Sequence, residues 1–174
     1  KRGVSPNLAL FVGPTPIRIH DMGYATRPPS AEERSNMNGL VKQAMEEGAM
    51  GLGSSLIYAP ADYASTEELI ELAKVASKYG GMYTTHMRSE GDFILKALNE
   101  TFRIAREANI PTEIYHLKLN IPRNWNKIDT VLGKIDSARR AGLRITANHY
   151  PYVASATGLT ARLPTWVQEG GASS

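Results

Sequence analysis

The stretch GGMYTTHMRSEGD (Gly80–Asp92) passes from a buried pattern into a polar loop. Two glycines stop a helical pattern, MYTTH then has the character of a strand, and an arginine and two carboxylates follow its histidine. The arrangement returns along the chain, because predicted strands begin near Met82, Glu113 and Arg144, each 31 residues after the one before. This spacing predicts successive βα units and therefore a parallel sheet with helices outside it.

The same pattern extends toward both ends of the chain. Strands are predicted at residues 7–12, 49–58, 82–87, 112–117 and 144–152, and helices at 30–48, 65–80, 94–108 and 128–142. Ser30 with Glu33, and Ser65 with Glu68, form Ser-x-x-Glu patterns that are typical of helix starts. Two α/β architectures fit this order: part of a (β/α)₈ TIM-type barrel, or an open five-stranded doubly wound sheet. In both, residues 1–174 form a single domain.

Composition excludes several classes of protein. The chain is 42% hydrophobic and 21% charged, which is an ordinary globular balance, and no apolar run approaches the ~20 residues that span a bilayer. Basic and acidic residues alternate at a formal charge of +3, so we expect neither a nucleic-acid surface nor a membrane partner. The absence of cysteine excludes disulfides and thiolate metal ligands, and it fits a cytoplasmic location.

Two histidines fall at the same place in consecutive βα units. His86 ends MYTTH, and His116 ends TEIYH, 30 residues later. Carboxyl ends of neighbouring parallel strands meet at one rim, so we expect the two imidazoles to converge. Imidazole is a common zinc ligand, so the pair predicts a metal site; two separately hydrogen-bonded polar residues are the alternative. His149 is disfavoured as a third ligand, because its spacing differs and the adjacent Tyr150 points to the opposite face.

Three further residues are candidates for contact with a ligand. Lys118 and Arg88 each lie two residues past one of the histidines, which places a cation beside the predicted metal where it could anchor an anionic substrate group. The alternative for each is a solvated loop charge. Tyr58 ends the predicted strand at 49–58 and could donate a hydrogen bond from its hydroxyl, unless it fills the core.

Several segments together resemble one enzyme family, the N-acyl-D-amino-acid deacylases (D-aminoacylases) of the amidohydrolase superfamily. The resemblance runs collinearly from about Leu8 to Gly171. It is carried by EGAMGLGSSLIYAP, YGGMYTTHMRSEGD, PTEIYHLK, the Asn124-Trp125 step and ANHYPYVASATGL…LPTWVQEGG. The weaker match VGPTPIR has Gly13-Pro14 where the family tends to carry Gly-His.

The resemblance implies a distorted (β/α)₈ barrel that holds one or two divalent metals, usually zinc. In that family, His86 resembles the metal ligand of the fifth strand and His116 that of the sixth. Tyr58 resembles the tyrosine that polarises the scissile carbonyl. Lys118 and Tyr150 resemble the groups that hold the substrate α-carboxylate. The implied substrate is an N-acyl-D-amino acid, and the reaction is hydrolysis of its linear amide bond.

The chain departs from the family pattern in ways that bear on activity. It has no His-x-His pair and no cysteine, and no strand after Tyr152 offers the aspartate of the eighth strand. The mapped strands are about strands 3 to 7, so we expect the central part of an amidohydrolase barrel, with weak metal binding and no useful turnover by itself. We also expect self-association through unpaired sheet edges. The alternative function is a non-catalytic α/β domain that binds a small anion or assembles with itself.

Overall fold

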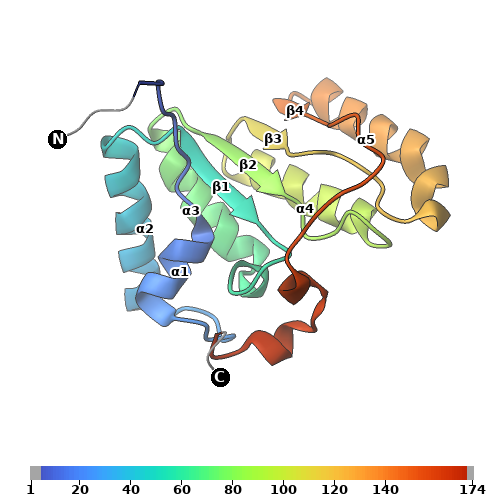
Figure 1. Ribbon diagram of the computed structural model, residues 1–174. Coiled ribbons are helices and arrows are strands. Elements are labelled where there is room, and N and C mark those ends of the chain that lie inside the picture. The colour runs from blue at the N-terminus through green and yellow to red at the C-terminus, as the bar shows by residue number, and fades with distance from the viewer. Residues whose placement is uncertain (1–4, 172–174) are drawn as a thin grey trace.

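The computed structural model describes residues 5–171, and it shows the predicted alternation of strands and helices (Figure 1). The strands are β1 (Gly51–Ser55), β2 (Met82–His86), β3 (Thr112–Ile114) and β4 (Ile145–Ala147), and the α-helices are α1 (Pro14–Met22), α2 (Ala31–Glu46), α3 (Thr66–Lys78), α4 (Ile94–Glu107) and α5 (Ile128–Arg140). Short 3₁₀ turns occupy η1 (Ala61–Tyr63), η2 (Pro122–Lys127), η3 (Leu159–Arg162) and η4 (Thr165–Gln168). No helix among the described residues has the length and apolar character needed to cross a membrane.

The four strands are all parallel and lie in the order β1-β2-β3-β4. A doubly wound sheet reverses its strand order at a switch point, whereas successive strands of a barrel stay neighbours. The helices follow the same order, since α2 packs on α3, α3 on α4 and α4 on α5. The predicted α/β fold is confirmed, and the sequential order is that of a barrel sector rather than of the open doubly wound alternative.

The prediction of a fifth strand at residues 7–12 is wrong for the described residues. There the segment makes one isolated parallel bridge between Val12 and Leu52, although the backbone N–H of Met50 also donates to the carbonyl of Leu10 at 2.8 Å. Leu8 and Leu10 are each 68% exposed, so their side chains lack the packing that stabilises a strand. The segment therefore lies along the edge of β1 without becoming a regular strand.

The two faces of the sheet differ in chemistry. Leu52, Tyr83, Thr112 and Ile145 share one register position, and all are buried. Because side chains alternate along a strand, the next position places Gly53, Thr84, Glu113 and Thr146 on the opposite face. The apolar face joins the hydrophobic clusters under the helices, and the second face is largely polar.

Two serines show how far a local pattern determines a helix start. At α2 the side chain of Ser30 accepts from the backbone N–H of Glu33, and the Glu33 carboxylate accepts from the backbone N–H of Ser30, as predicted. At α3 the Ser65 side chain accepts from the backbone N–H of Glu68 at 3.1 Å. The Glu68 carboxylate instead pairs with Arg18 of α1, so this capping motif is half complete.

Gly51 begins β1 at a point of close backbone approach. Its φ is +152°, and a Cβ atom added there would lie 1.9 Å from the carbonyl oxygen of Met82. No side chain fits such a space without moving one strand away from the other. The pairing of β1 with β2 therefore requires glycine at this position.

Candidate metal and substrate site

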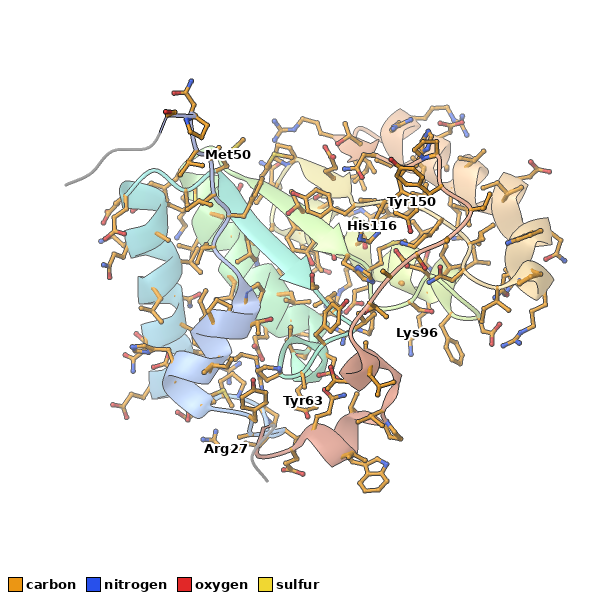
Figure 2. All side chains as sticks on the ribbon, viewed as in Figure 1. Arg27, Met50, Tyr63, Lys96, His116 and Tyr150 are labelled. Carbon is orange, nitrogen blue, oxygen red and sulfur yellow. The ribbon has the colours of Figure 1, made fainter. Side chains whose placement is uncertain are left out.

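The sequence-predicted site residues gather at the carboxyl ends of the strands. His86 is the last residue of β2, His116 follows β3 by two residues, and Tyr150 follows β4 by three. Tyr58 follows β1, and its ring centroid lies 6.1 Å from that of His86. Figure 2 shows the labelled side chains of His116 and Tyr150 close together, and their ring centroids are 6.3 Å apart. The topology thus brings four strand ends to one place, as a parallel sheet requires.

His86 and His116 converge in the manner predicted. Their ring centroids lie 4.5 Å apart at an interplanar angle of 75°. Glu90 joins them from the loop after β2, with Oε1 2.9 Å from Nδ1 of His116 and Oε2 3.9 Å from Nε2 of His86. One donor atom from each of the three residues lies within 4.8 Å of the other two. We call these three residues the His–Glu–His cluster.

The electrostatic environment of His86 suits a metal ligand. Burial lowers the pKa of His86 below 6.5, and the charges of His116 and Lys118 lower it further, while the nearby Glu90 carboxylate raises it. The side chain is therefore neutral at pH 7, which is the form that coordinates metals. Its Nε2 is buried and has no hydrogen-bond partner among the described residues. A buried nitrogen that lacks a partner, close to a carboxylate and a second imidazole, fits a divalent cation such as zinc.

Lys118 lies directly against the His–Glu–His cluster. Its Nζ is 2.6 Å from Glu90 Oε1 and 2.9 Å from Nδ1 of His116, and it donates to the carbonyl of His116 at 3.1 Å. The same ammonium lies 5.4 Å from the centroid of the Tyr150 ring. Asn120 donates from Nδ2 to the other oxygen of Glu90 at 3.0 Å. Glu90, only 5% exposed, is therefore the centre of a dense polar network.

A cavity of about 760 Å³ opens over these side chains. Its walls include the His–Glu–His cluster, Lys118, Tyr150 and Tyr58, and residues 154–157 cover one side. The Tyr58 hydroxyl lies 2.6 Å from Oγ1 of Thr157 in that covering segment. If Thr157 donates this hydrogen bond, the Tyr58 proton stays free to point into the cavity. The arrangement combines a hydroxyl donor, a cation and a metal-binding group around one ligand-sized space.

Arg88 borders the cavity but has other partners. Its Nε and Nη2 donate to the Glu100 carboxylate at 2.9 and 3.0 Å, Nη1 donates to the carbonyl of Asp62 at 2.7 Å, and Nη2 also donates to that of Ala64 at 2.9 Å. All three guanidinium nitrogens are thus engaged. An anion-anchoring role for Arg88 would require it to leave these acceptors.

The backbone around His116 is held by polar groups of the neighbouring strand. His116 has a φ of +40°, which is unusual for a residue other than glycine and ends β3 earlier than the sequence predicts. Its N–H donates to Oδ1 of Asn148 at 2.6 Å, and Nδ2 of Asn148 donates to Glu113 at 2.5 Å. These bonds hold the backbone from which the His116 ring projects.

Sequence analysis missed Glu90 as a member of the site. The signal was present, because HMRSE places a carboxylate four residues after His86. An exposed loop acid has the same sequence pattern, however, and only the turn after β2 brings Glu90 under both imidazoles. Asn120 and Asn148 were missed for the same reason, since their partners lie 30 and 32 residues away along the chain.

No family model matches the chain, but individual proteins do. D-Aminoacylase of Alcaligenes xylosoxydans xylosoxydans is 40% identical over 153 residues, which are 88% of this chain and 31% of that protein. A crystal structure of D-aminoacylase, described as defining a novel subset of amidohydrolases, superposes with a TM-score of 0.80 at 39% identity, covering 84% of this chain and 31% of the other.

A second solved structure that matches this chain contains zinc. N-Acyl-D-glutamate deacylase from Bordetella bronchiseptica, complexed with zinc and a phosphonate that mimics the tetrahedral intermediate, matches with a TM-score of 0.81 at 34% identity over 84% of this chain and 31% of that one. The resemblance seen in the sequence is therefore confirmed. The chain spans about a third of the length of the relatives it matches.

Proposed function

Because this chain is similar to the D-aminoacylases of the amidohydrolase superfamily over most of its length, we propose that it forms part of a metal-dependent hydrolase of N-acyl-D-amino acids. The observation that carries the proposal is the His–Glu–His cluster, which lies beside a lysine at the carboxyl ends of adjacent parallel strands. Residues of this kind at this edge of a barrel are typical of an active site. The whole activity belongs to a polypeptide about three times as long as the matched segment.

The proposed metal site consists of His86, His116 and Glu90. Two imidazoles and a carboxylate are a common ligand set for catalytic zinc, so zinc is the ion that we propose. When bound, such an ion polarises an amide carbonyl and lowers the pKa of water to about 7. His86 contributes a neutral donor without deprotonation at pH 7, since burial has already lowered its pKa.

The remaining roles follow from the cavity. Lys118 and Tyr150 bind the substrate α-carboxylate, by charge and by a hydroxyl, and so orient the acyl amide toward the His–Glu–His cluster. Tyr58 donates a hydrogen bond to the acyl oxygen as negative charge grows there. We place Arg88 outside substrate binding because Glu100 and two backbone carbonyls occupy its guanidinium.

Zinc binding by the 174-residue chain tests the ligand assignment. We expect titration against a competing chelator to show one weak site that is lost in His86→Asn and in His116→Asn. The matched control is His149→Asn, because His149 is exposed just after β4. Unchanged zinc binding in both cluster variants would contradict the proposed ligands.

Turnover requires its own measurement. By itself the chain should release no amino acid from N-acetyl-D-amino acids. A polypeptide of the relatives' length that contains this segment should hydrolyse the D-enantiomer and not the L-enantiomer, and it should lose that activity on chelation. Hydrolysis that survives chelation would overturn the metal-dependent assignment. The single domain, the cytoplasmic location and the self-association expected from the sequence stay predictions.

A further inference from the structure

The ammonium of Lys118 contacts the same oxygen and nitrogen atoms that the proposed metal ion would use as ligands. Its Nζ is 2.6 Å from Glu90 Oε1 and 2.9 Å from His116 Nδ1, and those two atoms are themselves 2.9 Å apart. The three atoms form a closed triangle with a cation at one corner. Lys118 thus occupies the position of a bound ion between an oxygen ligand and a nitrogen ligand.

We propose that Lys118 is an internal cation that occupies the His–Glu–His cluster when metal is absent, and that metal binding displaces its ammonium into the cavity. The inference rests on the proposed function and goes beyond it. It makes metal occupancy the condition under which Lys118 becomes free to bind a substrate carboxylate. Substrate without metal would then meet a lysine that is already neutralised by Glu90.

The chemistry of the triangle makes the two states exclusive. An ammonium group only donates, so in the tautomer whose Nδ1 is unprotonated, His116 accepts from Lys118 with the Nδ1 lone pair. The same lone pair is the one that nitrogen would offer to a metal ion. Glu90 Oε1 is shared in the same way, and two cations so close to one carboxylate repel each other. The ammonium therefore leaves when an ion takes these donors.

The surroundings provide both a place for Lys118 and a means of keeping Glu90 in position. Lys118 already borders the cavity, with the Tyr150 ring 5.4 Å away, so rotation of its side chain suffices for release. The backbone next to Lys118 is held across the sheet meanwhile, since the N–H of Leu117 donates to the carbonyl of Asn148 at 2.8 Å. Asn120 continues to hold the other oxygen of Glu90.

Arg88, in the loop after β2, provides a contrast with Lys118, which follows β3. Its guanidinium pairs with Glu100 and with backbone carbonyls, none of which belongs to the His–Glu–His cluster. Metal binding does not compete for these acceptors, so Arg88 stays in place. Of the two cations that the sequence places beside the histidines, only Lys118 is paired with atoms that a metal would claim.

A double-mutant cycle on zinc affinity tests the competition. In the 174-residue chain, Lys118→Met should bind Zn²⁺ about tenfold or more tightly than the wild type, because the ion no longer has to break a charged hydrogen bond. In the Glu90→Gln background the same substitution should gain less than about threefold, because its main partner is already gone. Far-UV circular dichroism checks that each variant is folded.

The cycle separates specific competition from general charge. The proposal is overturned if Lys118→Met gains no zinc affinity. It is also overturned if the gain is equal in both backgrounds, because an equal gain would come from long-range repulsion between the lysine and the zinc ion. If no variant and no wild-type chain binds zinc, both this inference and the metal-dependent function fail. If the wild type binds zinc and the cycle shows no coupling, only this inference fails.

Lysine reactivity provides a second readout that does not depend on affinity. Brief acylation followed by mass spectrometry of the peptides should show Lys118 modified faster after zinc is added, because its ammonium has left Glu90. Exposed Lys96 is the internal reference and should keep its rate. An unchanged or lower rate at Lys118 when zinc saturates the chain would overturn the release.

Discussion

Two glutamates, Glu68 and Glu90, are each 5% exposed, yet their surroundings differ. Within residues 5–171, the Glu68 carboxylate pairs with one side chain, the fully buried Arg18, whose Nη1 lies 2.8 and 2.6 Å from its two oxygens. The Arg18 guanidinium also donates to the backbone carbonyls of Ala25 and Arg27, so this pair fastens α1 and the following loop to α3. Glu90 instead lies among two imidazoles, an ammonium and an amide.

The difference separates a carboxylate that joins two helices from one that we propose to bind a metal ion. Both are buried and both are paired, so burial and charge alone do not distinguish them. The Glu68 pair is closed to exchange: the Arg18 guanidinium contacts both carboxylate oxygens, and its full burial keeps any ligand from taking its place. The Glu90 network is open to exchange, because it contains a neutral imidazole and a lysine that both border a cavity. Exchangeable partners, more than burial, indicate a functional site.

The largest effect is expected where the closed pair is broken. Arg18→Met should lower the free energy of unfolding by about 3–5 kcal/mol, because it leaves the Glu68 charge buried without a partner. The double variant Arg18→Met, Glu68→Leu should recover most of that loss, since no uncompensated charge remains. Urea denaturation of the three proteins measures both changes. If the single variant is as stable as the double variant, the unpaired charge of Glu68 does not cause the loss, and the prediction is contradicted.

A smaller effect is expected at the open network and should depend on pH. Because burial lowers the pKa of His86 below its unfolded value of 6.5, the unfolded chain binds more protons below that pH. The metal-free protein should therefore lose stability as pH falls below about 6.5. His86→Gln should flatten this loss, and the exposed control His149→Gln should not. Urea midpoints between pH 7.5 and 5 measure the slopes; equal slopes in wild type and His86→Gln would contradict the assignment.

The smallest effect is expected at an exposed ion pair that lies outside the candidate site. Arg103 of α4 pairs with Glu67 of α3 at 2.6 Å, with side chains 42% and 62% exposed. Exposed ion pairs contribute little, so Arg103→Met should change the free energy of unfolding by less than about 1 kcal/mol. Since Glu67 is next to Glu68 in the sequence, this variant also controls for the charge of that segment. A loss as large as that in Arg18→Met would mean that burial does not determine how much these ion pairs contribute to the free energy of unfolding.

Local chemistry predicted much of the fold. The 31-residue repeat predicts the parallel sheet because successive βα units place their strands side by side, and Ser30 with Glu33 predicts the start of α2 because both lie within one turn. The Ser65 motif is only half complete because the second partner of Glu68 is Arg18, 50 residues away. The segment at residues 7–12 has the apolar character of a strand, but its exposed leucines have nothing to pack against among the described residues.

The site was predictable to the same extent. The phase of His86 and His116 depends only on where parallel strands end, so their convergence followed from the repeat. Glu90 depends on the path of a loop, and the pairing of Lys118 depends on Glu90, so neither could be read from spacing. The turn at His116, with its positive φ, likewise depends on a contact to Asn148 across the sheet.

The close approach at Gly51 has a consequence for how sequences related to this chain can vary. The requirement for glycine comes from the distance between two backbones and is independent of what the rim of the sheet does. A lineage that abandoned the chemistry of the strand ends would be free to replace Glu90 or Lys118, but it would still need glycine at the start of β1 to keep β2 beside it. Gly51 therefore marks inheritance of the architecture, whereas Glu90 with Lys118 would mark inheritance of the proposed activity.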